Sequence, residues 1–252
     1  MPGNPIAFAR RTLDPGLFSD RAGPMEDFYV NTIGLPFLER LQHDDNYAEL
    51  FFELFEGKLK IQASTEPMEA AISGYRELYL ARDVPEPRTH RDPDGLTVHV
   101  VPVGYRGVTN VGVVCAVSDV DRQRQFLEAA MGGTPHEGGI RVGDTQIFVE
   151  HDPELQAPTP PMRRGFTYIT LIVHDALACR ESLLGAGATD SLRLLRLADR
   201  CLFSWLRDPH GNWIELVQYT ELSGELPDID RMADNWDEVI HWRETAAATV
   251  AG

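Results

Sequence analysis

A carboxylate inside an apolar strand is the feature of this sequence that points most directly to chemistry. Residues 208–216 read Asp-Pro-His-Gly-Asn-Trp-Ile-Glu-Leu, and the Pro and Gly of this segment predict a sharp turn into a strand. In that strand Trp213 and Glu215 share one face, while Ile214 and Leu216 share the other. Burial of a carboxylate is costly unless it is paired, hydrogen-bonded or bound to a metal. Glu215 is therefore a candidate functional residue.

Glu215 ends the last of several similar stretches of sequence. Residues 107–218 are predicted to pass twice through a strand, a helix that begins after an aspartate, and further strands. The predicted elements are strand 111–117, helix 122–130, and strands 139–142 and 145–150 in the first pass, then strand 166–173 and helix 176–184 in the second. The repetition indicates a strand–helix–three-strand unit.

The first hundred residues follow the same plan less regularly. The predicted elements of the first unit are strand 6–13, helix 25–33 and strands 37–42, 48–55 and 58–63. A second unit has strands at 75–81 and 96–101 but only Pro85 to Arg88 where its helix would lie. The pattern therefore predicts four units, the second of them truncated. An amphipathic helix is predicted from about residue 228 to 245.

Composition and charge limit the partners. The formal net charge is −16, from 39 acidic and 23 basic residues, which argues against nucleic acid and anionic membrane surfaces as partners. No apolar run approaches the roughly 18 residues that span a bilayer, and the N-terminus lacks the layout of a signal peptide. The three scattered cysteines are predicted to be reduced core residues. We expect a soluble, cytoplasmic protein.

Five segments resemble the vicinal oxygen chelate superfamily, which holds glyoxalase I, bleomycin-resistance proteins and the extradiol dioxygenases. The first two are similar to helices of that family with their glycine exits, and the others to its opening and closing strands. The segments are 28–37, 118–133, 142–150, 165–175 and 207–218. They span most of residues 6–218, and their order matches the predicted repeat.

The resemblance implies an α+β fold in which tandem βαβββ modules form two curved, mixed-sheet half-barrel domains, followed by a C-terminal helix. The implied domains are an N-terminal glyoxalase-like domain at 1–104, a C-terminal one at 105–219 that carries the site, and a helix and tail at 220–252. In the first domain, Arg76 and His99 occupy the implied ligand positions. A guanidinium argues against a metal there, so this domain is expected to be structural or ligand-binding.

The resemblance also implies where further site residues lie. The family's opening-strand histidine precedes the helix-entry aspartate by seven residues, and counting back from Asp175 gives Tyr168. Counting back from Asp119 gives Gly112, or Asn110 if the strand carries a two-residue extension. The histidines expected at these positions are thus absent.

Two carboxylates complete the implied set, Glu215 at the position of the family's metal-binding glutamate and Glu150 at the end of the third unit. Glu215, Glu150 and Tyr168 are the predicted catalytic residues, and both carboxylates are candidate metal ligands. Without histidines they could hold a divalent ion (Mn, Mg, Fe, Zn or Ni), with hard cations favoured, or form a metal-free acid/base pair. Asn110, Trp213 and His174 are the predicted substrate contacts.

The resemblance implies an enzyme that acts on a small oxygenated organic substrate as an isomerase, a lyase or a ring- or C–C-cleaving enzyme. Two alternatives stay open. An extradiol-type dioxygenase would match the two-domain plan, although the missing histidines count against it. A non-catalytic binding or resistance protein would need only an aromatic-lined cleft, for which Trp205 and Trp213 offer walls. A homodimer is also left open.

Overall fold

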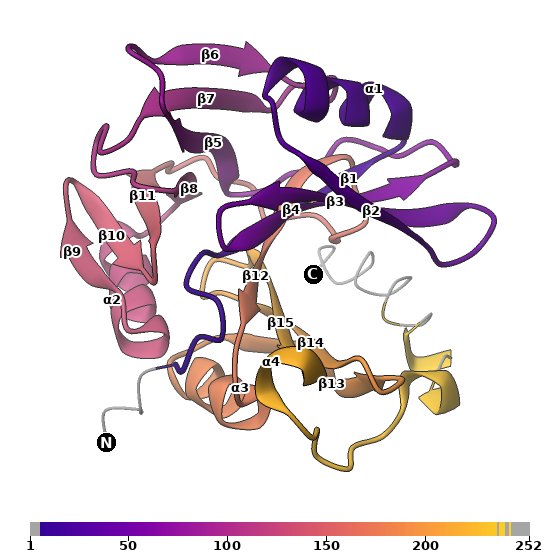
Figure 1. The fold of residues 1–252 in the computed structure, drawn as a ribbon. Helices are drawn as coiled ribbons and strands as arrows, with labels where there is room; N and C mark the ends of the chain where they lie inside the picture. Colours follow the sequence, from indigo (N-terminus) through magenta and orange to yellow (C-terminus); the bar gives the residue numbers. More distant parts are fainter. Residues whose placement is uncertain (1–5, 236, 240–241, 243–252) are drawn as a thin grey trace.

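Two mixed β-sheets form the framework of the computed structural model, which describes residues 6–235, 237–239 and 242 (Figure 1). The eight-stranded sheet has the order β13 (Thr189–Leu197), β14 (Cys201–Arg207), β15 (Trp213–Tyr219), β12 (Gly165–Ile172), β1 (Asp14–Ser19), β4 (Gly57–Ser64), β3 (Tyr47–Leu54), β2 (Phe37–Gln42). The seven-stranded sheet has the order β6 (Arg88–Arg91), β7 (Thr97–Pro102), β5 (Tyr75–Arg82), β8 (Val111–Val117), β11 (Thr145–His151), β10 (Gly139–Val142), β9 (Thr134–His136). The predicted α+β class with curved mixed sheets is confirmed.

The strand order shows which units share a sheet. The first and fourth units together make the eight-stranded sheet, through the antiparallel pairing of β1 with β12. The second and third units make the seven-stranded sheet, through β5 and β8. The third and fourth units therefore lie in different sheets and do not together surround Glu215. The boundaries at 104/105 and 219/220 as limits of domains stay a prediction.

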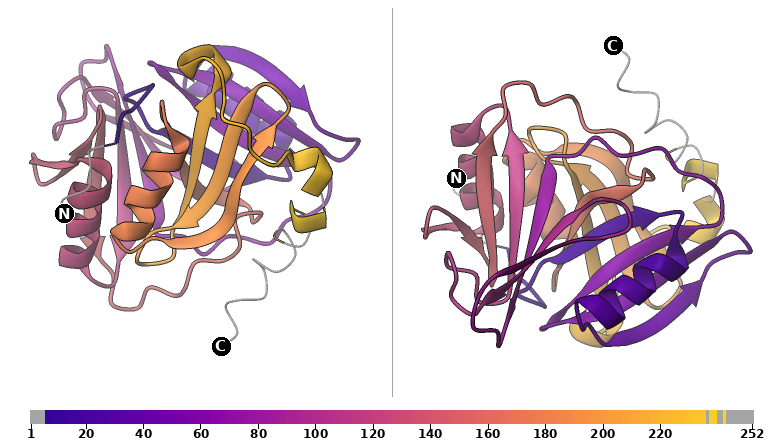
Figure 2. Two further views of the ribbon diagram at one scale, coloured as in Figure 1. Left: turned by 90° about the horizontal axis from the view of Figure 1, so that it is seen from below. Right: turned by 90° about the horizontal axis from the view of Figure 1, so that it is seen from above.

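The helices of the third and fourth units lie side by side on the outside of the sheets (Figure 2). They are α2 (Val120–Met131) and α3 (Ala176–Gly185), and each begins after the predicted aspartate. Asp119 accepts a hydrogen bond from the Arg122 amide, and Asp175 from the Ala178 amide, both at 3.0 Å. These caps satisfy amide groups that a helix start leaves free. In the first unit, α1 (Ala22–Asp27) runs into a π-helical turn (Phe28–Thr32).

The opening strand of the first unit is not where the sequence pattern put it. A strand was expected at 6–13, but β1 begins at Asp14, and before it Phe8 forms only an isolated bridge with Val173. Asp14-Pro15-Gly16 has the composition of a turn, which hides the strand. Gly16 is needed because a Cβ there would lie 2.0 Å from Cζ of Tyr168. Between β5 and β6 of the second unit there is no helix among the described residues.

The C-terminal prediction falls partly outside the described residues. Within the predicted helix 228–245, Met232–Asn235 forms a 3-10 turn, whereas residues 236, 240–241 and 243–245 are not described. Across the described part of the chain, no helix is long and apolar enough to cross a membrane.

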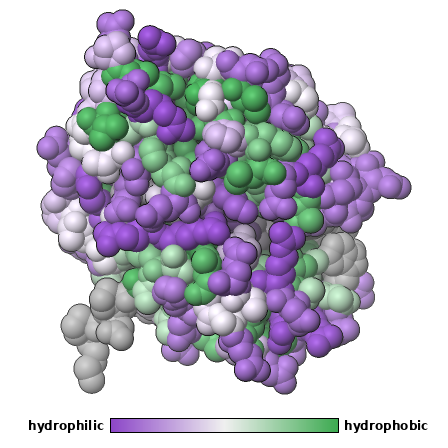
Figure 3. Space-filling model, in the orientation of Figure 1, coloured by the Kyte–Doolittle hydropathy of each residue, from purple (hydrophilic) through white to green (hydrophobic). Residues whose placement is uncertain are grey.

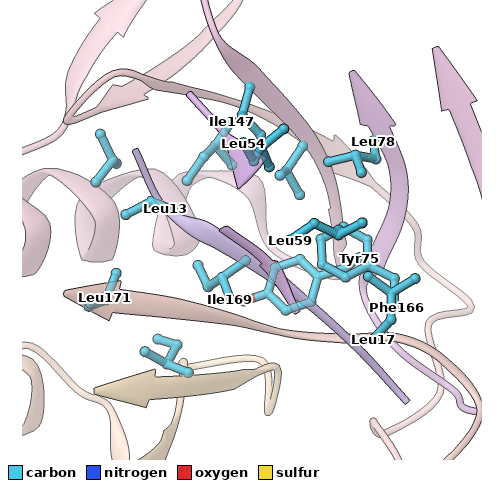
Figure 4. Packing of buried hydrophobic residues seen from close by; sticks show 14 of the residues in the cluster. Leu13, Leu17, Leu54, Leu59, Tyr75, Leu78, Ile147, Phe166, Ile169 and Leu171 are labelled. Atoms are coloured by element: carbon cyan, nitrogen blue, oxygen red, sulfur yellow. The ribbon is translucent and has the colours of Figure 1, made fainter. Parts of the chain in front are cut away.

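The main core lies between the two sheets. Leucines of β1, β4 and β5 meet aromatic and branched side chains of β11 and β12 there (Figure 4). Ile214 and Leu216 belong to this core, while Trp213 packs in a second cluster on the other face of β15, as the alternation predicted. All three cysteines are buried and free. On the face drawn in Figure 3, hydrophilic residues surround separate hydrophobic patches.

Candidate functional site

A cavity of about 1120 Å³ occupies the concave face of the eight-stranded sheet. Its walls come from alternate residues of β3 and β4 in the first unit and of β14 and β15 in the fourth, because successive side chains of a strand point to opposite faces. Glu49, Lys60, Gln62, Phe203, Trp205 and Glu215 are among them. Met232, Val239 and Trp242 of the C-terminal segment line it as well.

Glu215 lies in this cavity wall and is held by two donors. The Lys60 ammonium Nζ donates to Oε2 at 2.9 Å, and the Thr170 hydroxyl donates to the same oxygen at 2.7 Å. The Lys60 side chain is only 2% exposed, and that of Glu215 is 12% exposed. Oε1 accepts no hydrogen bond from a described residue. One carboxylate oxygen is therefore fixed, and the other is available to a ligand.

The charge state of Lys60 follows from its surroundings. Burial lowers its pKa, but the attraction of Glu215 and the smaller effect of nearby acidic groups outweigh this, so its pKa stands well above the usual value. Lys60 is thus an ammonium ion and not a neutral nucleophile. Removal of one partner from a buried ion pair is costly because the remaining charge is uncompensated.

Tyr168 lies in the same cup but is covered. It is fully buried, and its hydroxyl accepts a hydrogen bond from Nε2 of Gln62 at 3.2 Å. Burial, and then the charge of Glu215, raise its pKa well above the ordinary value. Gln62 also donates to Glu49 at 2.8 Å and contacts the Tyr47 hydroxyl. Tyr168 therefore supports the cavity through Gln62.

A second buried carboxyl lies behind the ion pair. Asp14 is opposite Thr170 in the β1–β12 register, and its Oδ1 accepts the Lys58 amide at 2.8 Å. Its Oδ2 is buried without a hydrogen-bond partner in the described structure. Burial raises the pKa of Asp14 to about 6, against the lowering effect of Lys60.

Other predicted site residues lie elsewhere. Glu150 is exposed at the end of β11, and Asn110 precedes β8, so both belong to the seven-stranded sheet and are not brought to Glu215. His174 is exposed just beyond β12. Trp213 packs against Trp205 and Trp242 in the second core cluster, and its Nε1 donates to the Thr159 carbonyl at 2.7 Å.

Lys60 and Thr170 were not predicted from the sequence as site residues. Lys60 lies in a predicted strand whose residues 58, 60 and 62 are polar while 59, 61 and 63 are apolar. In a strand with such alternation, the polar residues are ordinarily predicted to face the solvent. The available signal was that this strand would lie inside a sheet, where a lysine needs a buried carboxylate as partner.

The residues around Glu215 do not fit a divalent metal. Within the described residues, no group of three or more His, Cys, Asp or Glu side chains could hold one. The ammonium of Lys60 contacts the one carboxylate that a metal would use, and it would repel a cation there. The implied metal ligands Glu215 and Glu150 lie in different sheets. The positive charge at this site is therefore that of the Lys60 ammonium.

Comparison with known proteins supports the fold. No protein-family model matches the sequence, and no curated protein matches it. Among solved structures, glyoxalase I from Zea mays is 15% identical over 85% of this chain and 96% of its own, with a TM-score of 0.64. A glyoxalase I mutant from Zea mays is 14% identical over 87% of this chain and 97% of its own, with a TM-score of 0.68. A putative dioxygenase from Bacillus subtilis is 11% identical over 97% of this chain and 97% of its own, with a TM-score of 0.59.

These identities establish likeness of fold. The chain has a two-domain fold like that of glyoxalase I, which the resemblance of its sequence segments led us to expect.

Proposed function

We propose that this protein is a metal-independent enzyme that binds a small oxygenated organic molecule in the cavity of the eight-stranded sheet and transfers a proton with Glu215. The observation that carries the proposal is the anchoring of Glu215. Oε2 is held by Lys60 and Thr170, and Oε1 is the atom open to a ligand. A general base needs this kind of fixed orientation toward the proton that it removes.

The surrounding residues suit such a step. Glu215 takes a proton either from a carbon next to a substrate carbonyl group, which gives an enolate, or from a substrate hydroxyl group, so that negative charge develops on the substrate oxygen and the proton is held on Glu215 until it returns to the product. Lys60, 2.9 Å from Glu215, supplies a fixed positive charge that stabilises this oxyanion in a site of low exposure. The hydrogen bond from Thr170 restricts the orientation of the Glu215 carboxylate, and that from Gln62 restricts the orientation of the Glu49 carboxylate. Proton transfer of this kind would support an isomerase or a lyase.

Measurements on metal-free protein test the proposal. After treatment with EDTA, carbonyl compounds are screened by thermal shift, and those that bind are assayed in D2O by NMR for exchange at carbon. We expect the untreated and treated protein to catalyse exchange equally. We expect Glu215→Gln to keep binding and to lose about 100-fold or more of the rate, the usual range for a general base. Glu128→Gln, on the exposed face of α2, is the control.

Two results would contradict this function. One is stoichiometric Fe, Mn, Zn or Ni in active protein with loss of the activity on its removal. The other is an undiminished exchange rate in Glu215→Gln.

A binding protein without turnover is the second candidate. It is favoured by the aromatic wall, where Trp205 lies 4.8 Å from Tyr168 and 5.3 Å from Trp242 between ring centroids. Tight binding without exchange in both wild type and Glu215→Gln would favour this function. The dioxygenase alternative has less support, because the site lacks the two histidines and one carboxylate that a non-haem iron site requires.

A further inference from the structure

The two walls of the cavity differ in character. Apart from Glu215, which pairs with Lys60, strands β14 and β15 of the fourth unit contribute the apolar or aromatic side chains of Phe203, Trp205, Val217 and Tyr219. The first unit contributes a polar wall, in which Glu49, Lys58, Lys60 and Gln62 stand beside a few aromatic rings. A ligand that fills about 1120 Å³ therefore meets an aromatic surface on one side and charged groups on the other.

Both lysines of the polar wall already have carboxylate partners. Lys60 pairs with Glu215 at 2.9 Å, and Lys58 lies 3.6 Å from Glu39. Each positive charge is thus balanced by a carboxylate of the cavity itself. An anionic ligand would have to compete with these internal pairs.

Glu49 is the carboxylate of this wall that forms no direct ion pair with a lysine or arginine among the described residues, although its charge is one of those that raise the pKa of Lys60. Its Oε1 accepts the Gln62 amide at 2.8 Å, and its Oε2 lies 3.7 Å from Nε2 of His43. The Glu49 side chain is 12% exposed and lines the cavity. A ligand that excludes water from Glu49 must provide a compensating charge or a strong donor, because a desolvated carboxylate is otherwise destabilised.

The rim carries charges of both signs, and two of its acids are already paired, Asp199 with Arg196 at 2.8 Å and Glu221 with Arg10 at 3.3 Å. Its exposed or half-exposed charged residues are the acidic Asp44, Asp199 and Glu221 and the basic Arg200 and Arg231. Arg200 lies 3.8 Å from Glu39. With a net charge of −16 over the whole chain, the surrounding field attracts cations and repels anions.

We infer that the ligand of this cavity is an aromatic molecule that carries an amine, with its ammonium group paired with Glu49 and its ring against Trp205 and Phe203. The aromatic wall also suits a cation, because the faces of such rings attract positive charge. This inference rests on the proposed function only in using the same cavity. It specifies a charge class that the proton-transfer step does not require.

Calorimetric titration with three matched probes tests the inference: 2-naphthylmethylamine, 2-naphthylmethanol and 2-naphthoate. The ring is constant, and the polar group is cationic, neutral or anionic. At pH 7 we expect the amine to bind at least about tenfold more tightly than the alcohol, as one charged hydrogen bond allows, and the carboxylate to bind most weakly. Glu49→Gln should raise the Kd of the amine about tenfold and leave that of the alcohol within about twofold.

The controls separate this inference from the proposed function. Glu128→Gln changes the net charge by the same amount far from the cavity and should leave the amine preference intact. Gln62 can still donate to the side-chain oxygen of Glu49→Gln, and a thermal melt establishes that the variant folds. Equal affinity for all three probes, or an unchanged amine Kd in Glu49→Gln, would overturn the amine inference and leave the proton-transfer function standing. Binding of no probe would overturn the amine inference, whereas loss of turnover with a retained amine preference affects only the function.

Discussion

The two sheets of this protein share a frame, yet one encloses a cavity and the other a packed cluster. In each sheet, a tyrosine of one opening strand lies opposite a glycine of the neighbouring opening strand. Tyr168 faces Gly16 in the eight-stranded sheet, and Tyr79 faces Gly112 in the seven-stranded sheet. The pairing of a large ring with a residue that lacks a side chain is therefore common to both cups.

The side chains around this frame make the difference. In the seven-stranded sheet, Tyr79 stacks on His99 with 4.3 Å between ring centroids, and the Arg106 guanidinium lies 4.3 Å from the ring centroid of Phe148. His99 is held on both sides, by Glu77 at 2.9 Å and Thr89 at 3.0 Å. In the eight-stranded sheet, long polar side chains and a wide aromatic wall surround open space. Within the described residues, residue choice on the flanking strands thus decides which of two similar cups is filled and which encloses the large cavity.

We call the concave side of the eight-stranded sheet, which encloses the cavity, the hollow cup, and that of the seven-stranded sheet the filled cup. Loss of the buried ammonium of Lys60 should be the most damaging change in the hollow cup. Lys60→Met leaves Glu215 uncompensated, and we expect a loss of about 3–5 kcal/mol in the free energy of unfolding, measured by urea denaturation. Lys58→Met, at a side chain that is 22% exposed, should cost below about 1 kcal/mol. A Lys60 variant as stable as wild type would mean that the pair does not organise this cup.

Truncation of a ring should separate the filled cup from the hollow one. Phe148→Ala removes a side chain that is 2% exposed from a packed cluster, and we expect a cost of about 3–5 kcal/mol. Phe203→Ala removes a half-buried ring from a wall that already faces open space, so about 1–2 kcal/mol is expected. Thermal and urea unfolding of the two variants would measure the difference. Similar costs would show that the two cups are packed alike.

The glycines of the shared frame should respond unequally. A Cβ at position 16 would lie 2.0 Å from Cζ of Tyr168, whereas one at position 112 would first meet Cγ2 of Val108 at 2.8 Å. Gly16→Ala should therefore cost up to about 3 kcal/mol and Gly112→Ala less, within the range for overpacked cores. Tyr168→Ala should relieve the effect of Gly16→Ala, so the double variant should cost less than the sum. Additive costs would argue against the predicted clash.

Asp14 should make the stability of the hollow cup depend on pH. Its pKa is raised to about 6 from 3.8, so between these values the folded chain binds a proton that the unfolded chain releases. Stability from this group therefore falls as the pH rises through about 4 to 6. Asp14→Asn keeps an acceptor for the Lys58 amide and should gain about 1–3 kcal/mol at pH 8 and almost nothing at pH 3.5. Urea unfolding at several pH values measures this slope, with Glu128→Gln as the control.

Much of the fold was accessible from local sequence patterns. The aspartate caps, the glycines after the helices and the alternating strands located α2, α3 and most strands, and the turn before Trp213 placed Glu215 on the cavity face. The first strand was misplaced because Asp14-Pro15-Gly16 has the composition of a turn. The conformation of these residues is set by their neighbours β4 and β12, which no local window includes.

The site was less accessible because its partners are distant in the chain. The resemblance placed Glu150 with Glu215 in one implied domain at 105–219, but the strand order puts the two residues in different sheets. Lys60 is 155 residues from Glu215, and nothing in either segment alone identifies the other. The burial of both charges can be predicted only when the first and fourth units are known to share a sheet.

That sharing has a consequence for how the chain is made. Strands β1 to β4 leave the ribosome before β12, the strand that extends their sheet, which begins at Gly165. Until β12 has been synthesised, one edge of β1 has no strand to pair with, and exposed strand edges favour aggregation. The second and third units can pair earlier, across a much shorter loop. We therefore expect the filled cup to fold first and the hollow cup to close late and slowly, as contacts between distant parts of a chain generally do.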